Sequence, residues 1–188
     1  MKKFMLTMLL TLTSSGAMAQ ICAADITKSA PNSRFVAEDN GTVKDLKTGL
    51  VWMRCPLGKT WNNASGSCSG ENLGTQWQTI LNEVADINSK PLHRLHKFAG
   101  YEDWRLPNAK ELFSLIEKSC IKPALNTKAF PNFMPADSFS TTSSLWSSTA
   151  VGSGDAALVM DARFGDVLTQ LPNKTGGNYG ALLVTDSK

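Results

Sequence analysis

The sequence predicts one α+β domain that contains two helices, antiparallel strands and two disulfide bonds. Strand-like runs come first, two helical segments follow, and further strand-like runs end the chain, an order typical of the α+β class. All four cysteines lie beyond residue 19, and an even count in an exported chain indicates disulfides. The 169 residues from Gln20 onward suffice for one domain that buries roughly 70% of its unfolded surface.

Residues 1–19 have the pattern of a signal peptide. Lys2 and Lys3 precede an apolar run over residues 4–12, and Ala17-Met18-Ala19 supplies the small-x-small cleavage pattern. The apolar run is too short to span a bilayer, and we expect no membrane span elsewhere. We therefore predict export to the periplasm, the cell surface or the medium.

The charge of the exported chain is almost balanced. Two of the 19 basic residues lie in the leader, which leaves 17 basic against 16 acidic residues. The overall charge does not favour binding to nucleic acid, so we expect no nucleic-acid partner. A site for a polyanion would have to be a local patch of basic side chains.

The cysteine spacing favours one pairing among three possible connectivities. Cys55 and Cys68 flank a loop rich in Gly, Asn and Ser, so a local disulfide is expected there, which leaves Cys22 with Cys120. Each bond would contribute roughly 2–4 kcal/mol. A zinc site is disfavoured because no Cys-x-x-Cys pair exists, and we expect neither a metal nor another cofactor.

The first part of the domain follows an N-terminal arm over residues 20–34, which is polar and irregular. Residues 42–45 and 50–53 are β-rich and flank a turn that ends in Gly49, a pattern that predicts a hairpin. Residues 56–74 are rich in Gly, Ser and Asn and are expected to form a loop.

The first helix is predicted to begin at Thr75, with Gln78 as its capping-box partner, and to end before Pro91. One face carries the apolar residues Trp77, Ile80, Leu81, Val84 and Ile87 at helical spacing.

A second helix is predicted after Pro107, where Asn108 can cap and Glu111 completes a capping box. It should end near Cys120 and bury Leu112, Leu115 and Ile116.

Four strand-like runs lie beyond Cys120 and are separated by turn residues. They predict an antiparallel meander over residues 145–149, 156–161, 167–171 and 179–184.

Several motifs resemble a known bacterial family. The string G-Y-E-D-W-R-L-P-N-A-K-E-L over residues 100–112 is similar to a signature of the family named for the C-terminal domain of the Legionella collagen-like adhesin. Three more strings agree in order, over residues 40–52, 145–149 and 162–166. The resemblance implies an adhesion domain over residues 35–188.

The motif itself is typical of a scaffold. Trp104 and Leu106 alternate with Arg105, as on an extended segment with one buried face, and Pro107 suits a first helical turn. Large aromatic residues usually pack in cores. We expect structural roles for Trp52, Trp104, Arg105, Leu106, Pro107 and Trp146.

The chain is also distantly similar to the C-type-lectin-like fold, in which two helices flank antiparallel sheets. The calcium-dependent sugar motifs Glu-Pro-Asn and Trp-Asn-Asp are absent, so the resemblance does not imply calcium-mediated sugar binding.

The sequence favours binding over catalysis. His93 and His96 are the only histidines, and no phosphate-binding glycine loop is present, so we expect no enzyme activity. We expect an exported adhesion domain for a surface glycan or sulfated polysaccharide; the alternative is a structural or protein-interaction subunit of an envelope or pilus-associated complex. The candidate ligand-binding residues are His93, Arg94, His96, Lys97, Lys110, Lys118 and Lys122.

Overall fold

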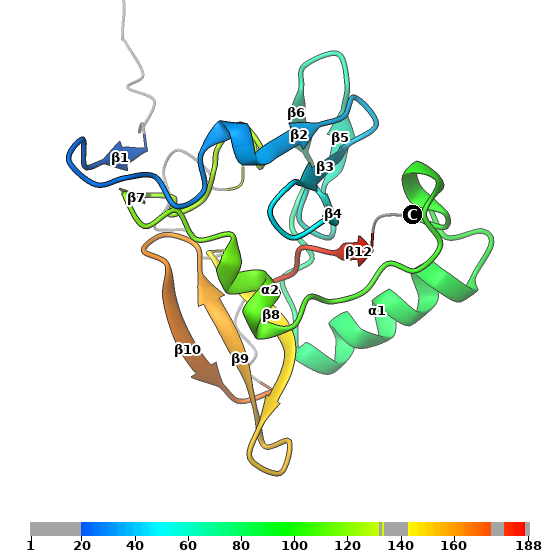
Figure 1. The fold of residues 1–188 in the computed structure, drawn as a ribbon. Coiled ribbons are helices and arrows are strands. Elements are labelled where there is room, and N and C mark those ends of the chain that lie inside the picture. The colour runs from blue at the N-terminus through cyan, green and yellow to red at the C-terminus, as the bar shows by residue number, and fades with distance from the viewer. Residues whose placement is uncertain (1–19, 132, 134–142, 174–178, 187–188) are drawn as a thin grey trace, which may run out of the picture.

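The computed structural model describes residues 20–131, 133, 143–173 and 179–186. The leader predicted over residues 1–19 lies outside this part of the chain. The described fold consists of two four-stranded sheets, two short two-stranded sheets and two α-helices (Figure 1). Together with two disulfides, this composition confirms the predicted α+β class.

One four-stranded sheet joins the start of the domain to its end. Its order is β12-β4-β3-β2, and all its pairs are antiparallel. The predicted hairpin is confirmed, because β3 and β4 pair with Thr42 opposite Met53. The strands are β2 (Phe35–Ala37), β3 (Thr42–Asp45), β4 (Leu50–Met53) and β12 (Val184–Asp186).

The other four-stranded sheet contains most of the predicted meander. Its order is β10-β9-β8-β11, and both β9 pairs are antiparallel. The strands are β8 (Ser144–Val151), β9 (Ala156–Asp161), β10 (Asp166–Gln170) and β11 (Tyr179–Gly180).

The prediction of a single last strand over residues 179–184 is wrong. β11 pairs with β8 in parallel, and the chain then crosses to the other sheet as β12. The crossing is stabilised by backbone hydrogen bonds: Leu57 N–H donates to the Ala181 carbonyl and Met53 N–H to that of Leu183, both at 2.9 Å. Residues 181–184 are fully buried, which explains their apolar character.

The two short sheets each lie beside a disulfide. β1 (Ile21–Cys22) pairs with β7 (Cys120–Ile121), and β5 (Thr60–Asn62) pairs with β6 (Ser67–Ser69). The prediction of a loop over residues 56–74 is wrong in part, because this segment contains the hairpin β5–β6. The bonds are Cys22–Cys120 and Cys55–Cys68, the expected pairs.

Helix α1 (Trp77–Ser89) has the predicted length but not the predicted cap. Its N-cap residue is Gln76, and no side chain caps the helix. The Thr75 N–H donates to the Tyr179 carbonyl across the fold at 3.1 Å. Ile80 and Ile87 are fully buried on the predicted apolar face.

Helix α2 (Ala109–Ser114) has the predicted capping box between Asn108 and Glu111. It ends earlier than predicted, several residues before Cys120. Because Asn108 is the N-cap, Pro107 precedes the helix instead of occupying its first turn.

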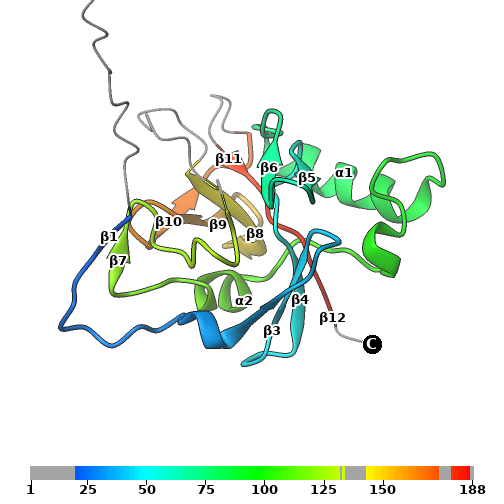
Figure 2. The same ribbon diagram turned by 90° about the horizontal axis from the view of Figure 1, so that it is seen from above.

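The core consists of two apolar clusters on opposite faces of shared strands. Trp52 lies in one cluster with Leu112 of α2, whereas Met53 lies in the other with Ile80 of α1. The central strands are therefore buried on both faces, which requires the continuous apolar run in β4. The helices consequently cover different faces of the strands (Figure 2).

The scaffold motif packs as expected. Trp104 and Trp146 are fully buried in the same cluster as Leu106. Between the buried Trp104 and Leu106, the Arg105 backbone exchanges two hydrogen bonds with Val184 of β12 at 2.9 and 3.0 Å. The Arg105 guanidinium pairs with Glu111 at 2.8 Å. The motif thus ties the entry of α2 to the last strand.

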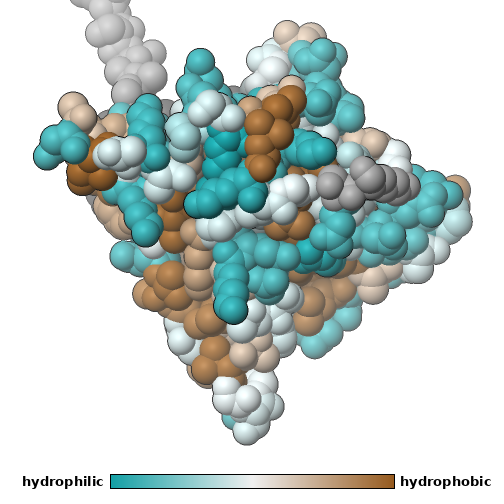
Figure 3. All heavy atoms as spheres, viewed as in Figure 1, coloured by the Kyte–Doolittle hydropathy of each residue, from teal (hydrophilic) through white to brown (hydrophobic). Residues whose placement is uncertain are grey.

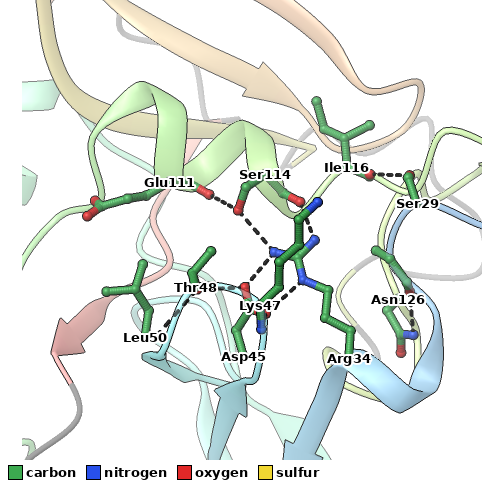
Figure 4. Close-up of polar contacts among 11 residues, drawn as sticks. Ser29, Arg34, Asp45, Lys47, Thr48, Leu50, Glu111, Ser114, Ile116 and Asn126 are labelled. Carbon is green, nitrogen blue, oxygen red and sulfur yellow. Dashed lines mark hydrogen bonds and ion pairs between the residues drawn. The ribbon is translucent and has the colours of Figure 1, made fainter.

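A buried ion pair fixes the N-terminal arm (Figure 4). Arg34 Nε donates to Asp45 Oδ1 at 2.7 Å, and a second guanidinium nitrogen donates to the Ser114 carbonyl of α2 at 2.6 Å. Burial alone raises the pKa of Asp45, but hydrogen bonds from Arg34, Thr48 and Lys47 outweigh it and lower that pKa. The arm, the β3–β4 turn and α2 therefore meet at one polar contact.

Among the described residues, no helix has the length and apolar character needed to cross a membrane.

Candidate ligand-binding site

The two histidines of the predicted basic patch stabilise the loop that follows α1. The backbone N–H of Leu95 donates to His93 Nδ1 at 3.1 Å, so His93 Nε2 carries the proton and faces Glu83 Oε1 at 3.1 Å. His96 Nδ1 lies 3.0 Å from the Ile87 carbonyl. Both imidazoles are therefore engaged in holding the loop against α1.

The two long basic side chains of this loop differ. Lys97 pairs with Glu102 at 2.9 Å. Arg94 instead points to β5, where its guanidinium lies 3.3 Å from Thr60 Oγ1 and 3.4 Å from the Lys59 carbonyl. Within the described part of the chain Arg94 has no carboxylate partner. The loop consequently presents one uncompensated guanidinium instead of a basic patch.

The predicted lysines do not join this loop. Lys110 lies on α2, and Lys118 and Lys122 flank β7, on the opposite side of the molecule from the end of α1 (Figures 1 and 2). Two further exposed lysines, Lys28 and Lys128, lie near the Cys22–Cys120 bond. Among the described residues, Lys28, Lys118, Lys122 and Lys128 have no ion pair. We call Lys28, Lys118, Lys122 and Lys128 the lysine group.

Arg94 borders a pocket of about 250 Å³, which we call the Trp61 pocket. Its walls come from three segments that are distant in sequence: the turn before β3, the region from β4 to β5, and the loop after α1. Buried apolar side chains, Met53, Leu57 and Leu95, form part of its lining. Polar lining groups come from Asn40, Lys59, Thr60 and Arg94. The pocket is thus mainly apolar and has a few polar groups.

Trp61 is held in one orientation within this pocket. Its Nε1 donates to the Asp39 carbonyl at 2.8 Å. The Arg54 guanidinium lies 4.1 Å from the ring centroid, a cation–π contact, and Arg54 in turn donates to the Ala129 carbonyl at 3.0 Å. Arg54 is not among the residues that line the pocket.

Gly41 permits the close packing of the aromatic side chains. It has a φ of +88°, and a Cβ there would lie 2.8 Å from Trp61 Cβ and 3.1 Å from Phe98 Cζ. Only glycine allows both rings to approach the turn this closely. The neighbouring disulfide also shapes the pocket, since Cys55 lines it and Cys68 pairs opposite Trp61 in the β5–β6 hairpin.

Sequence reasoning missed the Trp61 pocket. The usable signal was a tryptophan in the middle of a segment otherwise rich in Gly, Ser and Asn, where an aromatic side chain has no obvious core to join. Arg94 is the one predicted ligand residue that lines the pocket.

A second pocket, of about 220 Å³, lies beside the Cys22–Cys120 bond, and we call it the Glu117 pocket. The carboxylate of Glu117 and the carboxamide of Asn126 are engaged internally, whereas Lys28 and Lys128, which also line the pocket, have no ion pair among the described residues. The buried Glu117 carboxylate accepts from the backbone N–H groups of Ser29, Ala30 and Ser119 at 2.9–3.0 Å. Burial raises the pKa of Glu117, but the hydrogen bonds from Ser119 and Ala30 outweigh it and lower that pKa. These contacts tie the N-terminal arm to the chain beyond α2.

The described residues contain no group of three or more His, Cys, Asp or Glu side chains that could hold a metal ion.

Comparison with protein-family models matches residues 41–184, about three quarters of the chain, to the Lcl C-terminal domain. This is an adhesin-type domain and not a known enzyme family. Comparisons with curated proteins and with solved structures found no match.

Proposed function

Because the chain belongs to the Lcl C-terminal domain family, we propose that it is an exported adhesion domain that binds a surface glycan in the Trp61 pocket. Its adhesin-type family and its two disulfides fit an exported protein. The observation that carries the proposal is the preformed aromatic pocket with a guanidinium that no described carboxylate neutralises.

The chemistry of the pocket suits a sugar. Small-ligand sites are typically concave and mainly apolar, with a few polar groups that orient the ligand. Trp61 offers a fixed aromatic surface for the C–H face of a sugar ring, and Asn40 and Thr60 offer hydrogen-bonding groups for hydroxyls. Arg94 adds positive charge, which favours an acidic or sulfated glycan.

The architecture supports a finer fold proposal. The two helices cover different faces of the strands, and the last strand β12 pairs with β4 near the start of the domain. These features agree with a C-type-lectin-like fold, which we propose for this domain. A final location at the cell surface or in the periplasm belongs to the same proposal.

Heparin chromatography and a glycan array test the function with the exported protein. Retention should fall steeply as salt rises, since an exposed guanidinium is screened. Trp61→Ala should weaken binding to every glycan that the wild type binds, whereas Lys110→Ala, a surface change on α2, should not. Equal binding by wild type and Trp61→Ala would reject the pocket, and no bound glycan at all would reject the function.

A protein-interaction subunit is the second candidate, and one observation favours it. Edge strand β10 exposes Val167 and Leu168, 48% and 40% exposed, and contains no Lys or Pro of the kind that usually protects sheet edges. Figure 3 shows apolar residues gathered over β9 and β10. The candidate partner is an envelope protein that adds a strand to this edge. Cell-envelope binding lost in Leu168→Lys but kept in Trp61→Ala would favour this alternative.

A further inference from the structure

We infer that the Trp61 pocket recognises one terminal sugar residue that carries a carboxylate, with the sugar ring on Trp61 and the carboxylate on Arg94; this inference rests on the proposed function. The size of the pocket is the first argument. Its volume of about 250 Å³ lies below the roughly 300–1,000 Å³ typical of sites for drug-sized ligands, so it accommodates one ring but not a run of sugars.

The lining indicates that the ligand enters by its end. Met53, Leu57 and Leu95 line the pocket and belong to the packed core cluster beneath the sheet. A polysaccharide chain cannot pass through a pocket that is closed by core side chains. The residue in the pocket is therefore the last one of its chain.

The Trp61 ring is prepared for stacking. Its Nε1 is fixed by the Asp39 carbonyl, and Arg54 supports one ring face without lining the pocket. The absence of a side chain at Gly41 leaves room for Trp61, since a Cβ there would lie 2.8 Å from Trp61 Cβ and Cγ. A platform that is ordered before binding loses little side-chain entropy when the ligand arrives.

The carboxylate preference follows from the charges around Arg94. His93 and Lys97 on the same loop face Glu83 and Glu102, but Arg94 makes only long contacts of 3.3–3.5 Å to neutral oxygens. A guanidinium has five donors in a planar fork that matches the two oxygens of a carboxylate. A carboxylate therefore gains stronger hydrogen bonds from Arg94 than those that it replaces.

Asn40 adds a directional contact for a sugar hydroxyl. Its Oδ1 accepts from the N–H and the hydroxyl of Thr42 at 3.1 and 2.7 Å, which fixes the carboxamide. Because Oδ1 is engaged, Nδ2 is the group of this side chain that remains to donate to a ligand. Asn40 lines the pocket, so that ligand would lie there.

Isothermal titration of the exported protein with single sugars tests the inference. The probes are glucuronate, galacturonate and N-acetylneuraminate, the methyl ester of each acid, and glucose 6-sulfate. We expect at least one acid to bind, with its ester and the sulfated sugar at least tenfold weaker. Arg94→Ala should abolish the difference between acid and ester, Arg94→Lys should keep part of it, and Trp61→Ala should remove binding of both.

The outcomes separate this inference from the proposed function. If glycans are bound on the array but no acid binds better than its ester, the carboxylate assignment is wrong and the function stands. If long chains bind and no single sugar does, end recognition is wrong. If neither array nor sugars bind, the proposed function itself fails. Circular dichroism of Arg94→Ala and Trp61→Ala, with Lys110→Ala as the control, verifies that each variant is folded.

Discussion

The Trp61 pocket and the Glu117 pocket are similar in volume, and each lies beside a disulfide, but they differ in what their polar groups contact. In the Glu117 pocket the carboxylate is surrounded by protein donors, and the Asn126 carboxamide likewise bonds to backbone on both sides of the pocket. In the Trp61 pocket the Arg94 guanidinium makes only long contacts to neutral oxygens.

The difference indicates two roles. Polar groups that satisfy one another stabilise the fold, whereas a polar group without a strong internal partner is available to a ligand. Charge alone is a poor guide, since in the most basic stretch of the sequence Lys97 pairs with Glu102 and both imidazoles contact the protein itself. Changes on the N-terminal side should therefore alter stability without altering binding, and changes around Trp61 should alter binding.

One of the two largest expected effects is on stability, from Asp45→Ala. It leaves the buried Arg34 guanidinium without its partner, and breaking one side of a buried pair costs about 3–5 kcal/mol. Asp86→Ala, which breaks an exposed pair with Lys90, should cost less than about 1 kcal/mol. Urea unfolding measures both free energies, and equal costs would contradict a stabilising role for the arm contact.

Removing each disulfide separates stability from binding. The Cys22–Cys120 bond spans 98 residues and the Cys55–Cys68 bond spans 13, so replacement by serine pairs should cost about 4.7 and about 3 kcal/mol in the chain-entropy account. Under conditions where both variants are folded, only the loss of Cys55–Cys68 should weaken glycan binding. Weaker binding in the Cys22–Cys120 variant alone would reverse the assignment of the two regions.

Acid should destabilise the Glu117 pocket. The pKa of Glu117 is lower in the folded chain than its usual 4.5, so its contribution is fully present above that value and is lost as pH falls through the folded pKa. Glu117→Gln should cost about 1–3 kcal/mol at pH 7 and less at pH 3. Urea midpoints at the two pH values measure this; a constant cost would show that the charge of Glu117 is unimportant.

The smallest effects on stability are expected in the loop after α1. Arg94→Ala and Lys97→Ala should each change it by less than about 0.5 kcal/mol, because both side chains are exposed. Arg94→Ala should weaken glycan binding about tenfold or more, as expected for a lost charged hydrogen bond, and Lys97→Ala less than about twofold. Equal losses in titration calorimetry would indicate a diffuse basic patch instead of a site at Arg94.

Local patterns predicted much of this fold. The β3–β4 hairpin, the apolar face of α1 and the Asn108–Glu111 capping box depend on neighbours a few residues apart, and the structure contains all three. The family strings were also sufficient to identify the family, because the family comparison matches residues 41–184. Contacts within one segment leave a readable pattern in the sequence.

Contacts between distant segments left no such pattern. Thr75 is not the cap of α1; its N–H donates to the Tyr179 carbonyl, more than a hundred residues away. The Trp61 pocket requires Asn40, Trp61 and Arg94 to meet, and nothing in their own segments indicates that they do. The pairing of Lys97 with Glu102 likewise depends on a loop conformation in which Lys97 has a positive φ.

A nitrogen-15 NMR titration of the exported protein with a uronate-terminated heparin tetrasaccharide tests the central claim most directly. Trp61→Phe identifies the Trp61 indole resonance. We expect saturable shifts of the Trp61 indole N–H and of the amides around Arg94, with unchanged resonances at the lysine group. Shifts centred on Lys28, Lys118, Lys122 and Lys128, with an unmoved Trp61 indole, would contradict it.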